Sequence, residues 1–157
     1  MSGPLTVIDL ADLAATERLA RRLAKALRPG DFIGLTGDLG AGKTTFARYV
    51  ISAVSGRAEE VPSPTFNLVL VYAFPHLILW HVDLYRLRTP EEAYELGIDD
   101  ALAEGVALVE WSERLGHFLP EDWLELRFEE AAGQTRRVHV RPHGRWIGRW
   151  RVLSDSL

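Results

Sequence analysis

A glycine-rich string between an apolar segment and a helical pattern is the feature that most restricts the fold of this chain. The string runs from Gly37 to Thr44 as GDLGAGKT and satisfies the pattern G-x-x-x-x-G-K-[ST]. Residues 32–36 precede it as a short apolar strand, and residues 44–55 follow it with helical periodicity. This order turns backbone N–H groups inward beside the positive end of a helix, so the loop is predicted to bind phosphate. The alternative is a turn that only reverses the chain.

The side chains of the loop predict a bound nucleotide with a magnesium ion. Lys43 is expected to reach the β and γ phosphates, and the Thr44 hydroxyl is expected to ligate Mg²⁺. Only two of the 18 basic residues are lysines, and one of them stands where this loop requires it. The predicted nucleotide-binding residues are Gly37, Asp38, Leu39, Gly40, Ala41, Gly42, Lys43, Thr44 and Thr45.

Two carboxylates at the ends of apolar strands are candidates for the metal side of the site. Asp83 follows the run 77–82, and Glu110 follows the run 106–109. A nucleotide hydrolase needs an acid there to hold or orient the magnesium shell, and ligands bind at the carboxyl ends of strands in open α/β sheets. We assign Glu110 to the magnesium ion and Asp83 to the water or metal shell, with Lys43 as the third catalytic residue. Either acid alone has the alternative role of a solvated strand end.

The segment Ser63-Pro64-Thr65-Phe66 follows the phosphate-loop helix at a distance that allows it to fold over a γ-phosphate. Ser63 and Thr65 are therefore candidates for a switch-like loop whose hydroxyls respond to the nucleotide. The alternative is a rigid proline turn in which the same hydroxyls cap nearby backbone groups, and spacing does not separate the two.

Trp111 and the scattered histidines are expected to be structural. Trp111 follows Glu110 directly, a position more typical of a core residue or a partner-facing anchor than of a base-stacking platform. His76, His81 and His117 lack a metal-binding spacing such as H-x-x-x-H.

The remaining pattern predicts one α/β domain over residues 1–157. A helix is expected over residues 12–27, with Asp12 as its cap, and the stretches 67–74 and 77–82 are close enough to form an antiparallel hairpin. Further predicted elements are short helices at 89–97 and 99–104, a buried strand at 106–109, and alternating strands at 123–128 and 137–140 on the sheet edge. The predicted fold class is the P-loop NTPase type: a mixed, mainly parallel sheet flanked by helices, with a hairpin and C-terminal edge strands.

Composition excludes several classes of protein. The chain has no cysteine, which rules out disulfides and thiolate chemistry. Its longest apolar run, residues 68–74, is far shorter than the roughly 18 residues that a membrane helix needs. Its start lacks a basic segment followed by an apolar one, so we expect a cytoplasmic protein that does not enter a membrane.

The formal net charge of −4 is divided unevenly along the chain. Residues 1–130 carry 12 Lys and Arg against 21 Asp and Glu, a net of −9, whereas residues 131–157 carry six Arg against one Asp, a net of +5. Arginines with tryptophans among them can bind RNA phosphates and stack on bases, which makes tRNA a candidate direct partner through Arg145 and Arg149. The alternatives are arginines that protect an edge strand or neutralise the acidic body, and docking to a protein partner.

Five strings in this order resemble the TsaE proteins, the P-loop ATPases of bacterial N6-threonylcarbamoyladenosine tRNA modification. They are GDLGAGKTT at 37–45, SPTF at 63–66, HVDLYRL at 81–87, ELG at 95–97 and VEW at 109–111. The resemblance spans about residues 12–130, and the chain departs from it at Ser112, where the family usually has proline.

The resemblance implies ATP binding and hydrolysis, with Mg²⁺, by the residues proposed above. Lys43 and Thr44 take the phosphate-loop roles, Ser63 and Thr65 belong to the switch-like loop, and Asp83 and Glu110 are the functional acids. It further implies an accessory ATPase of the TsaD–TsaB heterodimer, which transfers a threonylcarbamoyl group to adenosine 37 of tRNA.

A small P-loop kinase that phosphorylates a metabolite is the rival function. Such a kinase normally carries arginines in a lid after the phosphate-loop helix, which neutralise the transferred phosphoryl group. Between residues 49 and 104 the chain has only Arg57, Arg86 and Arg88. The same scarcity leaves no evident arginine finger, so hydrolysis by the isolated chain is expected to be slow.

Overall fold

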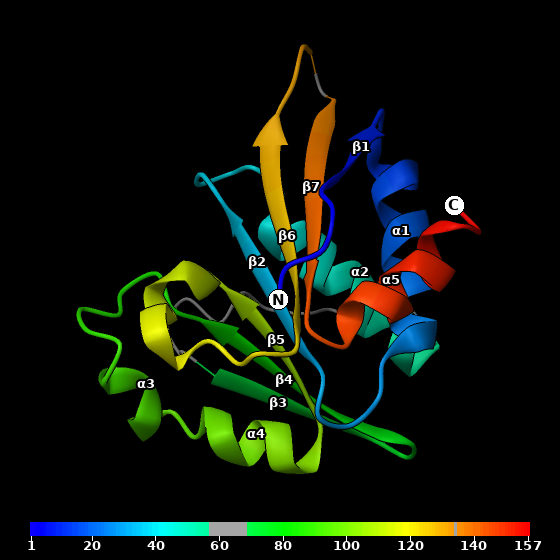
Figure 1. Ribbon diagram of the computed structural model, residues 1–157. Helices are drawn as coiled ribbons and strands as arrows, with labels where there is room; N and C mark the ends of the chain where they lie inside the picture. Colours follow the sequence, from blue (N-terminus) through cyan, green and yellow to red (C-terminus); the bar gives the residue numbers. More distant parts are fainter. Residues whose placement is uncertain (57–68, 134) are drawn as a thin grey trace.

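The computed structural model describes residues 1–56, 69–133 and 135–157, and it confirms an α/β protein in which helices flank a seven-stranded sheet (Figure 1). The strands are β1 (Thr6–Leu10), β2 (Phe32–Gly37), β3 (Val69–Phe74), β4 (Leu77–Asp83), β5 (Val106–Glu110), β6 (Trp123–Glu130) and β7 (Arg136–His143). The helices are α1 (Leu13–Ala26), α2 (Lys43–Ser55), α3 (Glu92–Glu95), α4 (Ile98–Glu104), α5 (Trp146–Ser154) and the 3-10 helix η1 (Ser112–Phe118). Among these described helices, none has the length and apolar character that crossing a bilayer requires.

The sheet is mixed, with the strand order β1-β7-β6-β2-β5-β4-β3. The pairings in its middle, β6 with β2, β2 with β5 and β5 with β4, are parallel, and the outer pairings are antiparallel. Strands β3 and β4 form the predicted hairpin around Pro75 and His76. The predicted fold class is therefore confirmed, and the carboxyl ends of β2, β4 and β5 lie side by side.

The expected edge position of the two C-terminal strands is wrong. β6 lies between β7 and β2, and β7 lies between β6 and β1, so β1 and β3 are the edges. The alternation that suggested an edge has another cause. In β6, Leu124, Leu126 and Phe128 are buried, whereas the residues between them are partly or fully exposed. An interior strand alternates in this way when only one face of the sheet is covered.

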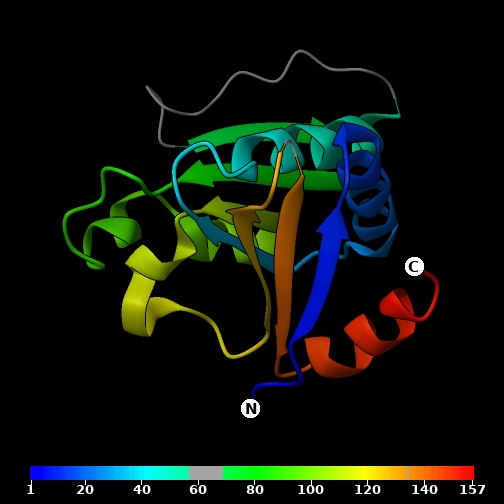
Figure 2. The ribbon, with the colours of Figure 1, turned by 90° about the horizontal axis from the view of Figure 1, so that it is seen from above.

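Two apolar cores lie on opposite faces of the sheet. Helices α1, α2 and α5 cover one face and contribute Leu23, Phe46 and Trp146 to the larger core. Helices α3, α4 and η1 pack on the other face, over the half of the sheet that contains β4 and β5. Figure 2 shows α1 and α2 side by side on the same side of the sheet. Because β5 is covered on both faces, all five of its residues are buried, as its apolar run predicted.

Helix starts and ends follow from local chemistry. The Asp12 side chain accepts a hydrogen bond from the Ala15 N–H at 2.8 Å, which caps α1 where the sequence predicted it. Helix α2 ends at Ser55 and is capped by Gly56, whose φ of 79° suits glycine in the left-handed region.

The C-terminal helix α5 was not predicted, and it uses the basic segment for packing. Trp146 and Trp150 are buried in the larger core, so neither is free to stack on a base. Between them, Arg149 donates to both carboxylate oxygens of Asp31 and to the Ala26 carbonyl, and its guanidinium lies 3.8 Å from the Trp146 ring centroid. Arg149 therefore neutralises the acidic body within the molecule, which was one of the alternatives for this segment.

The pairing of Arg149 with Asp31 predicts a large effect on stability. Asp31 is buried, and Arg149→Met removes its guanidinium partner and leaves the carboxylate with the Arg28 N–H hydrogen bond. We expect the free energy of unfolding, measured by urea denaturation, to fall by about 2–3 kcal/mol. The matched control is Arg145→Met, since Arg145 has 89% of its side chain exposed and only a 3.7 Å contact with Asp122. The control should change stability by no more than about 0.5 kcal/mol, and equal losses in both variants would contradict this role for Arg149.

Candidate nucleotide-binding site

The phosphate loop leaves β2 at Gly37 and enters α2 at Lys43. Gly37 has a φ of 128°, and a Cβ there would lie 2.2 Å from the Phe128 carbonyl oxygen, so the close approach of β6 requires glycine. Gly42 caps α2 with a φ of 113° and offers no side-chain hydrogen bond to it. The first N–H groups of the helix therefore have no side-chain cap and are available to an anion.

Lys43 is folded into this loop. Its side chain is buried, and its ammonium donates to the Gly37 carbonyl and, at 2.8 Å, to the Asp38 carbonyl. The ammonium also lies 4.2 Å from the Trp111 ring centroid, a cation–π distance. Burial lowers the pKa of Lys43, and the charge of Glu110 is the largest opposing influence. The loop thus holds a buried cation on carbonyls that a phosphate could replace.

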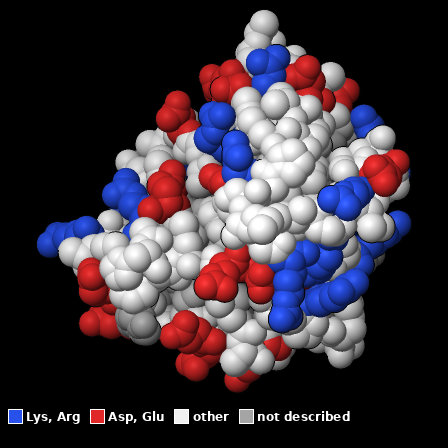
Figure 3. Space-filling view, viewed as in Figure 1, with Lys and Arg blue, Asp and Glu red and all other residues white. Residues whose placement is uncertain are grey.

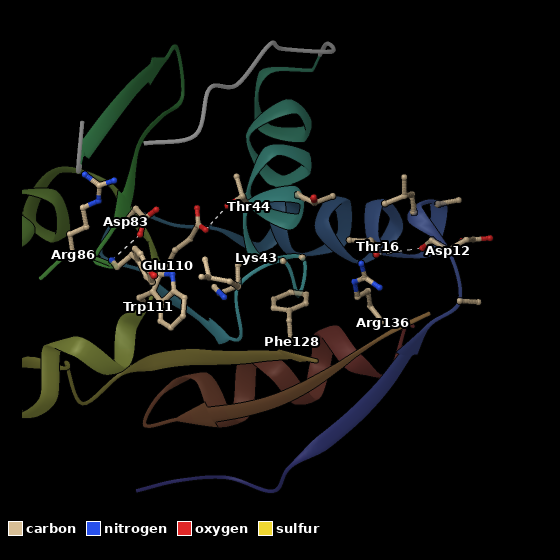
Figure 4. A pocket seen from close by; sticks show the side chains of 18 residues that line it. Asp12, Thr16, Lys43, Thr44, Asp83, Arg86, Glu110, Trp111, Phe128 and Arg136 are labelled. Atoms are coloured by element: carbon tan, nitrogen blue, oxygen red, sulfur yellow. Dashed lines mark hydrogen bonds between the residues drawn. The ribbon is translucent and has the colours of Figure 1, made fainter. Parts of the chain in front are cut away.

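The two predicted acids meet at the end of the loop. Asp83 and Glu110 are paired neighbours on the parallel strands β4 and β5, and both are buried. The Thr44 hydroxyl donates to Glu110 Oε1 at 2.6 Å, which joins residues 66 positions apart (Figure 4). Asp83 Oδ1 accepts the Tyr85 N–H at 2.9 Å. Lys43, Thr44, Asp83 and Glu110 therefore share one site, although only the first two are neighbours in sequence.

Burial sets the electrostatics of the acids. Loss of water raises the pKa of Asp83, and the adjacent charge of Glu110 raises it further, against the Tyr85 N–H, which lowers it. Burial also raises the pKa of Glu113, in the first turn of η1. These carboxylates lie around Lys43, so the site combines one buried cation with several partly desolvated acids.

The oxygen donors fit a magnesium ion that is completed by phosphates. Mg²⁺ prefers oxygen ligands and is commonly held by one or two protein groups together with the phosphates of its substrate. Thr44 and Glu110 supply a hydroxyl and a carboxylate in contact, with Asp83 beside them. No group of three or more His, Cys, Asp or Glu side chains suited to a metal occurs in the described ranges. Side chains in those ranges thus form no complete metal cage by themselves, and Thr44 and Glu110 would hold the ion together with phosphate oxygens.

A cavity of about 990 Å³ extends from these acids across the loop. At one end lie Asp83 and Glu110, and at the other lie the first turn of α1 and the side chain of Arg136 from β7 (Figure 4). Leu39, Gly40, Gly42, Lys43, Thr44 and Thr45 line it, whereas the predicted residues Gly37, Asp38 and Ala41 are not among its lining residues. Sequence reasoning did not find the α1 and Arg136 end, because these segments join the site only through the folded sheet.

His81 was expected to be only structural, but it contacts the site. Its Nε2 lies 2.7 Å from Glu110 Oε2, and both side chains are buried. A signal for it existed: His81 stands two residues before Asp83 in an otherwise apolar strand, and such residues share one face of the sheet.

Trp111 lies at the cavity rather than in the centre of a core. It is half-buried, and its φ of 59° is the one positive value at a non-glycine residue in the described part of the chain. Its ring contacts Tyr85 at a centroid distance of 5.0 Å. Backbone in this region is uncommon outside glycine and often marks functional sites. Ser63 and Thr65, the predicted switch-like residues, lie outside the described residues.

Comparison with known proteins identifies the family of this site. The family model for threonylcarbamoyl adenosine biosynthesis protein TsaE matches residues 10–138. The chain belongs to the TsaE family. This family takes part in tRNA threonylcarbamoyladenosine biosynthesis. The matched residues contain the phosphate loop, both acids and Trp111.

Relatives within the TsaE family cover most of the chain. The tRNA threonylcarbamoyladenosine biosynthesis protein TsaE of Rickettsia bellii is 44% identical over 125 residues, which are 80% of this chain and 87% of the relative. The protein of the same name from Streptomyces coelicolor is 43% identical over 148 residues, 88% of this chain and 96% of the relative. The crystal structure of Bacillus subtilis YdiB superposes with a TM-score of 0.79 at 29% identity, covering 99% of this chain and 95% of YdiB.

The raised pKa of Asp83 predicts that this acid destabilises the ligand-free fold. A group whose pKa is raised in the fold favours folding below its ordinary pKa, here 3.8, and loses that contribution as the pH rises through the raised value. Asp83→Asn keeps an acceptor for the Tyr85 N–H but carries no charge. In ligand-free protein we expect the Asn variant to match the parent in stability near that acid limit and to exceed it at neutral pH. Thermal unfolding across this pH range measures the difference, and an Asn variant that is less stable at neutral pH would contradict the assignment.

Proposed function

We propose that this chain binds ATP with Mg²⁺ and hydrolyses it as the accessory ATPase of tRNA threonylcarbamoyladenosine formation in the cytoplasm. The observation that carries the proposal is the contact between Thr44 and Glu110 at 2.6 Å. It joins a helix-starting hydroxyl to a strand-end carboxylate beside a glycine loop. These groups fit the metal side of a nucleotide triphosphate.

The cavity suits a whole nucleotide, not phosphate alone. Its volume of about 990 Å³ is at the upper end of small-molecule sites. The triphosphate lies over the loop in this proposal, and the nucleoside extends toward the first turn of α1 and Arg136. Adenine as the base is taken from the family.

Each residue of the site has a separate task in the proposed reaction. The N–H groups of the loop and of the start of α2 bind phosphate oxygens, and the Lys43 ammonium moves from the Gly37 and Asp38 carbonyls to the phosphates. Thr44 and Glu110 hold Mg²⁺, which when bound neutralises charge on the phosphates. Asp83 orients the attacking water through its carboxylate or takes part in the metal shell.

The arrangement of positive charge supports activation by a partner. Among the described residues that line the cavity, the arginines are Arg86 and Arg136, and Arg136 lies at the end away from the acids. Arg86 is exposed at the rim. We propose that the TsaD–TsaB heterodimer supplies or organises the missing charge, which makes hydrolysis by the isolated chain slow.

We propose that tRNA is reached chiefly through that heterodimer. Arg149, a candidate for direct contact, is engaged with Asp31, which leaves Arg145 as the exposed member of the pair. Figure 3 shows Lys and Arg gathered at the lower right, where Figure 1 places α5 and the C-terminal end of α1. Any direct contact with tRNA would involve this face.

Replacement of Lys43 tests the phosphate loop. Lys43→Ala removes the cation that compensates phosphate charge. We expect the rate of ATP hydrolysis to fall at least about 100-fold, since removing one group that stabilises transition-state charge has an effect of this size in other enzymes. Steady-state ADP release measures it, with circular dichroism to show that the fold is retained. Lys25→Ala is the matched control, because Lys25 is exposed on α1 away from the cavity lining. Normal turnover in Lys43→Ala would refute the loop assignment.

The dependence of ATP turnover on the partners tests whether hydrolysis by this chain belongs to tRNA threonylcarbamoyladenosine formation. We expect ATP turnover by the chain alone to be slow and to rise strongly when the TsaD–TsaB pair and tRNA are added together. The same assay with γ-labelled ATP distinguishes hydrolysis from the kinase alternative. Transfer of label to a small molecule, or a rate that the partners leave unchanged, would contradict the proposal.

A further inference from the structure

We infer that His81 is a positioning residue, whose imidazole holds one carboxylate oxygen of Glu110 so that the other oxygen faces Thr44 and the phosphate loop. The inference rests on the proposed function for what Glu110 does, but the hydrogen bond itself can be tested independently. Nothing in the family description or in the names of the relatives assigns this role.

The two oxygens of Glu110 have separate partners. Oε1 accepts the Thr44 hydroxyl at 2.6 Å, and Oε2 lies 2.7 Å from His81 Nε2. Glu110 is 2% exposed and His81 is fully buried, so water does not compete for the contact between them, whereas the contact with Thr44 is part-buried at the cavity. A carboxylate that is hydrogen-bonded at both oxygens cannot rotate without breaking one bond. His81 therefore determines which way Oε1 points.

The surroundings of the second ring nitrogen, Nδ1, indicate which nitrogen of His81 carries the N–H that faces Glu110. His81 Nδ1 is buried and has no hydrogen-bond partner among the described residues. Because the buried Nδ1 faces no acceptor, we place the ring N–H on Nε2, where the Glu110 carboxylate accepts it. Within the described part of the chain, the hydrogen bond to Glu110 is the one polar contact of the ring.

A purely structural histidine is a poor explanation for this site. The residues of β4 that share its face are Leu77, Leu79, His81 and Asp83, and the two leucines pack in the core under α2. Leucine at position 81 would continue this apolar row and avoid the cost of burying an imidazole with one bare nitrogen. The imidazole contributes what leucine cannot, a donor directed at the functional acid. Residues that orient metal ligands in this way commonly matter 10- to 100-fold for activity.

Two substitutions separate positioning from packing. His81→Leu fills the space without a donor, and His81→Gln places an amide N–H near the position of Nε2. Under the activated assay we expect His81→Leu to lower kcat about 10- to 100-fold. We expect little change in KM or in ADP affinity measured by calorimetry, because the loop amides and Lys43 are intact. His81→Gln should recover most of the lost rate.

The matched control is a second histidine–glutamate pair on the same sheet. His139 Nε2 lies 2.8 Å from Glu129 Oε1, on β7 and β6, and neither residue lines the cavity. His139→Leu breaks a histidine–glutamate contact of similar length that is part-buried and lies away from the cavity, and it should leave kcat unchanged. Loss of turnover in this control equal to that of His81→Leu would assign the effect to general packing and overturn the inference.

The imidazole protons give a readout that does not depend on turnover. With ¹⁵N-labelled histidine, the ligand-free protein should show His81 as the Nε2–H form, with a proton resonance that disappears in Glu110→Ala and persists in Glu129→Ala. A His81 ring protonated at Nδ1 alone would overturn the inference even if ATP proves not to be the substrate. Conversely, an inactive parent chain that shows the expected resonance would reject the proposed function and keep the contact.

The kinetic outcomes are equally decisive. Wild-type kcat in His81→Leu, or an equal loss in His81→Leu and His81→Gln, would overturn the role of the donor. If His81→Leu does not fold, the Gln variant decides alone: a folded protein with near-parental kcat sustains the inference, and a folded protein with a 10-fold or greater loss rejects it.

Discussion

The hydrogen bond between Thr44 and Glu110 depends on almost every other feature of the fold. The two residues are 66 positions apart, and they meet because β2 and β5 pair in parallel with Leu35 opposite Glu110. This register places the end of β5 next to the loop that leaves β2. The parallel pairing of β5 with its other neighbour, β4, places Asp83 directly beside Glu110. A shift of one residue in either pairing would turn the acids to the opposite face of the sheet, where α4 and η1 pack.

The two cores hold this register from both sides. The larger core fixes α2 against the sheet through Phe46 and its neighbours, so Lys43 and Thr44 start the helix at a set height. The smaller core buries Val82 and Val109, each one residue before one of the two candidate acids, Asp83 and Glu110. Successive residues of β4 and β5 therefore point to opposite faces of the sheet: the valines anchor the smaller core, and the acids that follow them point into the site. The outer strands and α5 add stability around this centre, with Arg149 as the main polar link.

Sequence patterns predicted the site better than its surroundings. The glycine loop, the two strand-end acids and the hairpin each have a local signature. The structure brings the two acids together with Lys43 and Thr44 of the loop. The missed elements have weaker local signals. β1 is a five-residue strand that is defined by its pairing with β7, more than 120 residues away in the sequence. Helix α5 buries Trp146, Trp150 and Leu153 at helical spacing, but its arginines suggested an exposed surface. Arg136 joins the site through a tertiary contact that no local pattern shows, whereas His81 had a local signal, its place two residues before Asp83 in an otherwise apolar strand.

In the proposed function, Thr44 and Glu110 together hold the metal of a nucleotide placed over the phosphate loop. The most direct measurement is a crystal structure with a non-hydrolysable ATP analogue and Mn²⁺, located by its anomalous scattering. We expect the metal peak beside the Thr44 hydroxyl and the Glu110 carboxylate, with the Lys43 ammonium transferred from the Gly37 and Asp38 carbonyls to the phosphates. A nucleotide bound over the loop with its metal away from both side chains, or a nucleotide bound elsewhere on the chain, would contradict the claim.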